Sequence, residues 1–249
     1  MIMTYKEIEQ MMISRRDDSQ REILMRFFRT APGQYGEGDD FLGIKVPVTR
    51  SIVKELRHNV ALNDISSLLD SRWHEVRLVG LLLLVEEMSA ALPRKRDSAE
   101  TALHKATRRE EVARFYLAHA RRANNWDLVD LSCEYVLGPY IFITGDYDIL
   151  IRLAGTNNLW EQRIAIVTTL YFIRQGVLQP TFEICDLLMN HPHDLIHKAM
   201  GWMLREAGKR DNEALVRYLD ANVGRMPRTT LRYAIERMPE SERKAWLKR

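Results

Sequence analysis

The sequence contains few cysteines, prolines and glycines. The shortage of cysteine argues against a disulfide-rich protein and against a zinc protein. Of its 249 residues, 2 are cysteines, 8 are prolines and 12 are glycines. Cys133 and Cys185 lie in no CxxC or Cys/His pattern, so neither a disulfide framework nor a zinc site is indicated. We therefore expect a protein of the reducing cytoplasm.

Long apolar runs and a strong net charge are also missing. The longest apolar run, residues 78–85, is far too short to span a bilayer, and residues 1–6 lack the apolar core of a signal peptide. We expect no membrane partner. The formal net charge is only +3, so a nucleic-acid partner would require cations that are concentrated on one face.

The prolines divide the chain at a nearly regular interval. Pro47, Pro93, Pro139, Pro180 and Pro227 are separated by 46, 46, 41 and 47 residues, and all eight prolines fall where we expect a helix to begin or end. The predicted helices are 48–59, 73–91, 98–120, 126–137, 158–175, 181–189, 195–208, 212–223, 228–237 and 241–247. Two helices in each interval of about 40–47 residues are typical of HEAT and armadillo arrays.

A short internal repeat supports this interpretation. Glu75-Val76-Arg77 and Glu161-Gln162-Arg163 lie 86 residues apart, and each precedes an apolar run. No segment alternates as a strand would. We expect an all-α fold, a single α-solenoid domain of HEAT-like helix pairs that covers residues 1–249.

One glycine-rich segment, residues 33–43, could suggest a phosphate-binding loop. No GKS or GKT sequence follows it and no strand precedes it, and Asp39 and Asp40 would repel a phosphate. We expect a connecting loop.

Trp126 and Asp130 lie on the wrong side of their predicted helix for core packing. Asn125 is a natural N-cap residue for this helix. Trp126 and Asp130 are four residues apart and therefore share one face, beside Asp127 and Glu134. The predicted core arc on the opposite side contains Leu128, Val129, Leu131, Tyr135 and Val136. An acid in the first turn favours the helix dipole, which explains Asp127 but not the deeper Asp130.

Trp202 repeats this anomaly on the predicted helix 195–208. It lies opposite the apolar arc, near Lys198 and Arg205, and Gly201 would let another molecule approach the backbone. An exposed tryptophan between two cations is typical of a nucleic-acid contact surface. The tryptophans that lie near apolar arcs, and that we expect in the core, are Trp73 and Trp160.

Arg163 is a charged residue in an apolar sector of the predicted helix 158–175. Such a side chain needs a partner. From the residues alone, a buried salt bridge to a neighbouring repeat and a phosphate held in a groove are equally good interpretations.

The cluster His191, His193 and His197 surrounds a proline but has no metal-binding spacing, and we expect a solvated turn. No GxSxG sequence or Cys-His pair indicates covalent catalysis.

Several of these residues lie in segments that resemble a known family. Residues 125–130 (NWDLVD), 158–166 (NLWEQRIAI) and 198–206 (KAMGWMLRE) resemble the three signature segments of the AlkD-type DNA alkylation repair glycosylases. Residues 41–47 (FLGIKVP) are similar to that family's FLGIK-x-P stretch. The matches extend from about residue 34 to residue 210 in the correct order.

The resemblance implies a HEAT-like array that binds duplex DNA in a basic concave groove and acts as a monomer. It implies hydrolysis of the N-glycosidic bond of cationic alkylated purines, chiefly N3-methyladenine and N7-methylguanine, without a metal or cofactor. It also implies that the lesion is not extruded into a pocket, and that the protein acts at the nucleoid.

The resemblance also assigns roles to individual residues. Asp130 matches the catalytic carboxylate, and Trp126 and Trp202 match the two indoles that flank the deoxyribose of the lesion. Arg163 matches a phosphate-binding arginine and Arg205 a second backbone contact. The further DNA contacts that we expect are Lys198, Lys45 and Tyr35.

Two other functions are compatible with a helical repeat. A non-catalytic DNA-binding module would recognise damaged or branched DNA and release no base. A protein-interaction scaffold would surround Trp202 with apolar residues, and the cations Lys198 and Arg205 argue against it.

Overall fold

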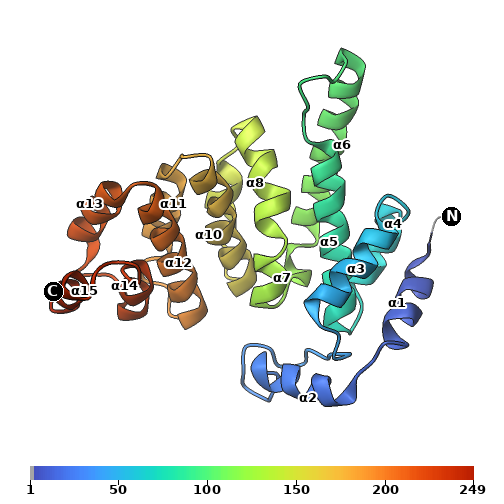
Figure 1. The fold of residues 1–249 in the computed structure, drawn as a ribbon, viewed down its shortest axis with the longest axis horizontal. Helices are drawn as coiled ribbons and strands as arrows, with labels where there is room; N and C mark the ends of the chain where they lie inside the picture. Colours follow the sequence, from blue (N-terminus) through green and yellow to red (C-terminus); the bar gives the residue numbers. More distant parts are fainter. Residues whose placement is uncertain (1–2) are drawn as a thin grey trace. The chain divides into compact units, whose positions relative to one another are not determined.

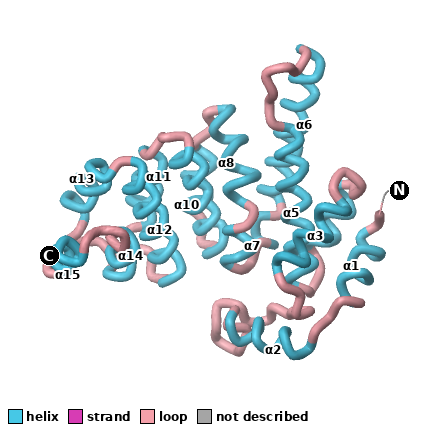
Figure 2. Tube along the Cα trace, viewed as in Figure 1, coloured by secondary structure: helices cyan, strands magenta, loops and turns pink. Residues whose placement is uncertain are grey.

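The computed structural model describes residues 3–249 (Figure 1). These residues form fifteen α-helices and one short 3-10 helix, and their only β geometry is an isolated bridge between Asp40 and Trp73 (Figure 2). The predicted all-α fold is confirmed. The chain divides into two compact units, Met1–Ser132 and Cys133–Arg249. That they form one solenoid domain with a concave groove stays a prediction.

The first unit is built around one long buried helix, α5. Its helices are α1 (Tyr5–Ile13), α2 (Asp18–Phe27), α3 (Val46–Leu56), α4 (Leu62–Leu69), α5 (His74–Ala91), α6 (Ala99–Ala118), the 3-10 helix η1 (Ala120–Arg122) and α7 (Trp126–Asp130). Helices α3, α4 and α6 contact α5. Because α5 is apolar on nearly every side, it can be covered on every side, and residues 74–84 are all buried.

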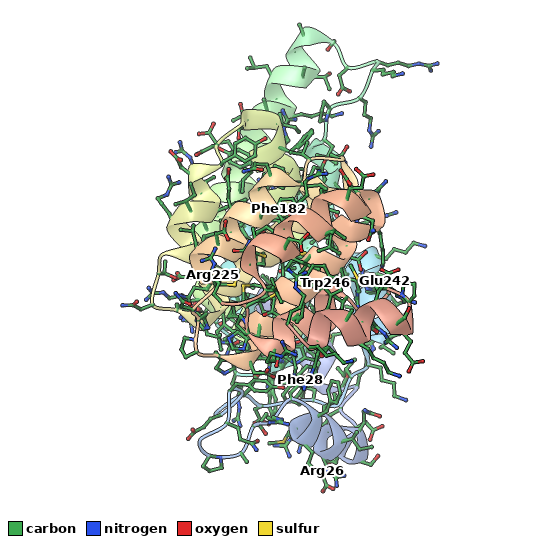
Figure 3. The ribbon with its side chains drawn as sticks, turned by 90° about the vertical axis from the view of Figure 1, so that its left-hand side faces the viewer. Arg26, Phe28, Phe182, Arg225, Glu242 and Trp246 are labelled. Carbon is green, nitrogen blue, oxygen red and sulfur yellow. The ribbon has the colours of Figure 1, made fainter. Side chains whose placement is uncertain are left out.

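The second unit has the same plan around α10. Its helices are α8 (Cys133–Thr144), α9 (Asp148–Ala154), α10 (Leu159–Arg174), α11 (Gln179–Leu188), α12 (Asp194–Arg210), α13 (Asn212–Asn222), α14 (Arg228–Ala234) and α15 (Glu240–Leu247). Helices α8, α9, α11 and α12 contact α10. Near the C-terminus the chain buries Trp246 of α15, with the guanidinium carbon of Arg249 4.4 Å from its ring centroid (Figure 3).

The two Glu-x-Arg sequences of the internal repeat begin these two central helices. Glu75 and Arg77 lie in the first turn of α5, and Glu161 and Arg163 lie in the first turns of α10. Both arginines are buried, at 6% and 5% exposure. The repeat therefore marks equivalent positions in the two units.

The predicted helix 126–137 is wrong because the structure contains two helices there. Helix α7 ends at Asp130 and α8 begins at Cys133. The hydroxyl of Ser132 donates to the carbonyl of Leu128 at 2.5 Å, in place of the residue's own N–H. The break changes the helical phase, so Tyr135, predicted in the core, is 41% exposed, and Glu134, predicted on the polar face, is buried.

Pro139 also departs from the sequence prediction. It lies inside α8, whereas Pro47 and Pro180 lie in first turns and Pro227 is an N-cap. A proline inside a helix leaves the carbonyl four residues earlier without its donor. Here that carbonyl belongs to Tyr135.

Four helices are absent from the prediction: α1, α2, α4 and α9. Helix α2 is the most exposed of them, since none of its residues is buried and Ile23 and Phe27 are 52% and 61% exposed. Arg26 points away from the unit, whereas Phe28, just after the helix, is buried (Figure 3).

Two further predictions concern core residues. Trp160 is buried as predicted, but Trp73 is half-buried, with the Arg72 guanidinium 4.5 Å from its ring centroid. Cys133 and Cys185 are buried and form no disulfide. Burial raises the pKa of the Cys185 thiol.

Over residues 3–249, no helix combines the length and the apolar character that a membrane crossing requires.

Gly43 provides a test of how the segment before α3 is positioned. Its φ is +86°, and a Cβ atom there would lie 2.1 Å from the carbonyl oxygen of Asp17. Gly43→Ala should lower the free energy of unfolding by more than about 2 kcal/mol, because strain at positive φ costs roughly 1–2 kcal/mol and the backbone overlap adds to it. Gly38→Ala is the matched control, with a φ of +81° and open space around it. Urea unfolding compares the two, and equal losses would contradict the predicted overlap.

Candidate functional site

The short helix α7 carries the two residues of the first unit that the sequence singled out. The side chain of Asn125 caps it and accepts from the Trp126 N–H at 2.9 Å. Trp126 and Asp130 both line one cavity of about 330 Å³, and both are half-buried. The cavity lies within the first unit, between the end of α2 and the starts of α3, α5 and α7. The structure therefore brings the predicted tryptophan and aspartate to one cavity.

Aromatic rings from distant segments form a wall of this cavity. The ring centroid of Trp126 lies 5.8 Å from that of Phe27 and 5.2 Å from that of Phe28. Phe28 stacks in turn on Phe41 at 5.1 Å. The prediction did not include these phenylalanines. The available signal was the apolar spacing 23, 24, 27 and 28, which is typical of an amphipathic helix.

Behind the wall, His74 is held between two carboxylates. Its Nδ1 lies 2.8 Å from Asp39 and its Nε2 lies 2.9 Å from Asp127, and its ring stacks on Phe41 at 4.2 Å. Burial alone would lower the pKa of His74, but the charge of Asp127 and the hydrogen bonds with both carboxylates raise it to about 9. His74 is therefore a buried imidazolium at neutral pH. We call Asp39, His74 and Asp127 the carboxylate clamp.

Arg77 completes the charge balance of the clamp. Its guanidinium forms an ion pair with Asp39 and donates to the carbonyl of Ser71 at 2.8 Å. Burial would raise the pKa of Asp39, but hydrogen bonding and the charges of His74 and Arg77 hold it below its usual value. Two buried cations thus oppose two buried carboxylates.

The carboxylate of Glu75 fixes the next part of the loop. It accepts three backbone N–H groups, from Leu42 at 2.8 Å, Gly43 at 2.8 Å and Ile44 at 3.0 Å. These residues belong to the FLGIK stretch, so one acid at the start of α5 determines the path of that stretch.

The two aspartates of the glycine-rich segment do not face outwards as bare charges. Asp39 belongs to the clamp, and Asp40 forms ion pairs with Arg21 at 2.7 Å and Arg72 at 2.5 Å. The segment is a connecting loop, as predicted. The expectation that Asp39 and Asp40 would repel a phosphate did not take their arginine partners into account.

Two predicted DNA contacts lie in the same region. Lys45 is exposed, is the N-cap of α3 and lines the cavity. Tyr35 is half-buried in the loop and does not line the cavity.

In the second unit, Trp202 lies in a hollow with several cations. It is half-buried and lines a space of about 530 Å³ together with Arg174, Lys209 and Arg210. Gly201 has a different use from the predicted one. A Cβ there would lie 2.6 Å from the carbonyl oxygen of Thr230, so this glycine lets α14 approach α12.

The other predicted contacts of this unit have partners within the protein. Arg205 forms an ion pair with Glu236, and Lys198 pairs with Asp194 at 2.8 Å. Arg163 is buried and donates to the carbonyl of Leu195 at 2.6 Å. Its role as a phosphate contact stays a prediction.

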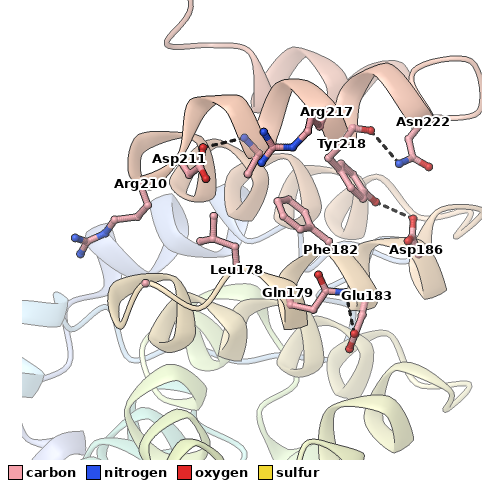
Figure 4. A pocket seen from close by; sticks show the side chains of 12 residues that line it. Leu178, Gln179, Phe182, Glu183, Asp186, Arg210, Asp211, Arg217, Tyr218 and Asn222 are labelled. Atoms are coloured by element: carbon pink, nitrogen blue, oxygen red, sulfur yellow. Dashed lines mark hydrogen bonds between the residues drawn. The ribbon is translucent and has the colours of Figure 1, made fainter.

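A larger hollow of about 850 Å³ lies between α11 and α13 (Figure 4). Phe182 stacks on Tyr218 at 4.8 Å, and the Tyr218 hydroxyl donates to Asp186 at 3.0 Å. The Gln179 side chain donates to Glu183 at 3.0 Å. These polar groups already satisfy one another, and we assign no site here.

The histidine cluster forms a turn, as the spacing indicated. His193 caps α12, and His191 bonds the side chain of Gln162 at 2.8 Å. Among residues 3–249, no group of three or more His, Cys, Asp or Glu side chains is placed to hold a metal ion.

Comparison with known proteins gives a family and a fold. A family model described as DNA alkylation repair enzyme matches residues 8–238. No curated protein sequence matches the chain. A solved structure described as a predicted DNA alkylation repair enzyme from Enterococcus faecalis is similar, with a TM-score of 0.67 and 17% sequence identity. The match covers 91% of this chain and 98% of that chain, and at this identity it shows the fold.

The clamp predicts a dependence of stability on pH. Because the pKa of His74 rises from 6.5 to about 9 on folding, its contribution is complete below pH 6.5 and is lost as the pH rises through 9. The loss should reach at most about 1.4 kcal/mol per pH unit in that window. His74→Gln cannot be protonated and should lack this slope. Urea unfolding of both proteins between pH 6 and 9.5 measures it, and parallel curves would show that His74 is not charged.

Proposed function

Since this chain belongs to the DNA alkylation repair enzyme family, we propose that it is a glycosylase that releases cationic alkylated purines from duplex DNA. Membership of this family indicates a role in DNA repair. The observation that carries the proposal is that Trp126 and Asp130 line one cavity from the same short helix. The expected substrates are N3-methyladenine and N7-methylguanine in duplex DNA.

The reaction requires few protein groups because the alkylated purine is cationic and is already a good leaving group. As the bond between C1′ and the base nitrogen breaks, its electron pair stays with the base and neutralises it, and positive charge develops on the sugar. The Asp130 carboxylate stabilises this charge, and the face of the Trp126 indole adds cation–π attraction. Water then forms the new bond to C1′ and gives its proton to the carboxylate or to solvent. A neutral purine is a poor leaving group without an acid to protonate it.

We propose that duplex DNA contacts both units, through residues predicted from the sequence. Lys45 is exposed beside the cavity and is available to a phosphate. Lys198 and Arg205 would exchange their carboxylate partners for phosphates. This exchange costs little for Lys198, because its pair with Asp194 is about half exposed and such pairs contribute little stability. The remaining proposed contacts are Trp202, as the second indole, Arg163 and Tyr35.

Asp130→Asn removes the proposed catalytic charge with little change in size. Base release from duplex DNA that contains N7-methylguanine should fall about 100- to 1000-fold, because a fixed electrostatic stabiliser of the transition state is lost. Affinity for the duplex should change little. Glu22→Gln is the control, since it removes one charge from an exposed position of the same unit.

Two outcomes would contradict the assignment. If the parent protein bound the duplex but released no base, it would be a non-catalytic DNA-binding protein. If Asp130→Asn released base as fast as the parent, another residue would be the catalytic one.

Lys45→Gln should weaken DNA binding and reduce the slope of log affinity against log salt concentration by about one, because one phosphate contact is lost. Lys54→Gln is the matched control, an exposed lysine in the last turn of α3. Fluorescence anisotropy titrations at several salt concentrations measure both slopes. Equal slopes for the two variants would place the phosphate contact elsewhere.

A further inference from the structure

The hollow beside Trp202 contains three cations that are not among the DNA contacts proposed above. It has a volume of about 530 Å³, and the side chains that line it come from the C-terminal halves of α10 and α12. The cations are Arg174 at the end of α10, and Lys209 and Arg210 at the end of α12. Cations beside an aromatic ring are typical of a surface that follows a nucleic-acid backbone.

Arg174 is held by one of its nitrogens and has the others available. Its Nη1 forms an ion pair at 2.5 Å with Glu134, whose side chain is only 3% exposed, whereas the Arg174 side chain is 49% exposed. Its Nε and Nη2 have no acceptor among residues 3–249. These two nitrogens form one edge of the planar guanidinium, which matches two oxygens of a phosphate. A buried carboxylate thus fixes the guanidinium while this edge stays available to an anion.

Lys209 can turn to an anion without leaving an acid unpaired. It pairs with Glu206 at 2.8 Å, and its side chain is 46% exposed. Glu206 also lies 3.5 Å from the Nε of Arg205, so it keeps a cationic neighbour if Lys209 moves. Exposed ion pairs contribute little stability, so the exchange of Glu206 for a phosphate costs little.

The charge of the hollow matches one phosphodiester group. Arg174, Lys209 and Arg210 carry three positive charges. Glu206, which lines the hollow, and Glu134, which lies behind Arg174, carry two negative charges. One positive charge therefore remains, and each phosphate of a DNA strand carries one negative charge.

The hollow also lies in line with the DNA contacts proposed on α12. Lys198, Trp202, Arg205 and Lys209 are four, three and four residues apart and therefore share one face of the helix. The helix rises about 16 Å from Lys198 to Lys209, which equals about five steps of 3.4 Å along a DNA strand. A strand that meets Lys198 at one end of this face can reach the hollow at the other end.

We propose that this hollow binds one backbone phosphate of duplex DNA, held by the Nε and Nη2 of Arg174 and by Lys209. The inference rests on the proposed function, which supplies the duplex as the ligand. A phosphate contact carries no information about the base. The hollow therefore strengthens binding to damaged and undamaged duplex alike, and it fixes how the strand lies on α12.

A charge-neutral double variant tests the contact of Arg174. Arg174→Gln combined with Glu134→Gln removes the guanidinium, leaves no buried acid unpaired and keeps the net charge of the protein. The slope of log affinity against log salt concentration should fall by about one, because one phosphate contact is lost. Fluorescence anisotropy titrations of an undamaged duplex measure this slope.

The control for this variant removes another ion pair of the same unit. Glu213→Gln combined with Arg217→Gln replaces an exposed pair on α13 and should keep the slope of the parent. Equal slopes for the two double variants would overturn the proposal.

Lys209→Gln tests the same hollow with a single change at an exposed position, where folding is not at risk. It should also lower the slope by about one. Lys244→Gln is its matched control, because Lys244 is an exposed lysine of α15 that pairs with an acid one turn away. If Lys209→Gln and Lys244→Gln gave the same slope, Lys209 would not hold the phosphate and the proposed site would be wrong.

Inorganic phosphate distinguishes a backbone phosphate from a free one. Titration calorimetry should detect no binding of inorganic phosphate to the parent, since the other DNA contacts, which raise the local concentration of a backbone phosphate, are then absent. Binding of inorganic phosphate that the Arg174 and Glu134 double variant lacks would make the hollow a site for free phosphate, against the proposal.

The outcomes separate this inference from the proposed function. If the parent releases base and Asp130→Asn does not, but the Arg174 and Glu134 double variant keeps the slope of the parent, the glycosylase stands and the phosphate site is wrong. If that slope falls by about one but no base is released from methylated duplex, the phosphate site stands and the glycosylase is wrong.

Discussion

The bonds of His74 with Asp39 and Asp127 are the constraint on which the rest of the first unit depends. They join a loop residue, the first residue of α5 and the second residue of α7, which lie 35 and 53 positions apart. Each buried carboxylate would be costly alone, and the protonated ring donates a hydrogen bond to each of them. Because His74 also stacks on Phe41, the same bonds place the aromatic wall beside Trp126. The geometry of the cavity thus depends on one buried proton.

Two acidic side chains shape this region, one through backbone N–H groups and the other through arginine side chains. Glu75 holds three consecutive N–H groups, and Asp40 holds Arg21 and Arg72. The two aspartates of the glycine-rich segment are in this way held by cationic partners. Lys45 follows it directly and is exposed beside the cavity. Glu75 and Asp40 therefore help to position Lys45, the lysine that we propose contacts DNA.

The sequence supported correct predictions for features that depend only on residues close together in the chain. The spacing of Trp126 and Asp130 and the cap at Asn125 follow from helix geometry, and both tryptophan and aspartate reach one cavity as a result. Contacts between distant segments were not predictable. Phe27 and Phe28 lie about a hundred positions before Trp126, and nothing in a single sequence connects them. Asp127 was explained by the helix dipole, which concealed its bond to His74.

The other misses have the same origin. Gly201 is required by α14, which packs against it, and the Ser132 hydroxyl interrupts a helix that periodicity alone would continue. The sequence shows that a glycine or a serine is present at these positions. Its structural role depends on a group from elsewhere in the fold or from the preceding turn. Arg163, for which the sequence left two interpretations open, donates to a carbonyl 32 positions away, and its role as a phosphate contact stays a prediction.

The buried cysteines have a consequence for a protein that works where alkylating agents are present. Methylating electrophiles react with thiolates as well as with purine nitrogens, and the thiolate is the reactive form of cysteine. Cys133 and Cys185 are both inaccessible, and burial disfavours ionisation of Cys185. Neither sulfur is therefore a ready nucleophile. Alkylation of these two thiols is therefore disfavoured under the same exposure that creates the proposed substrates.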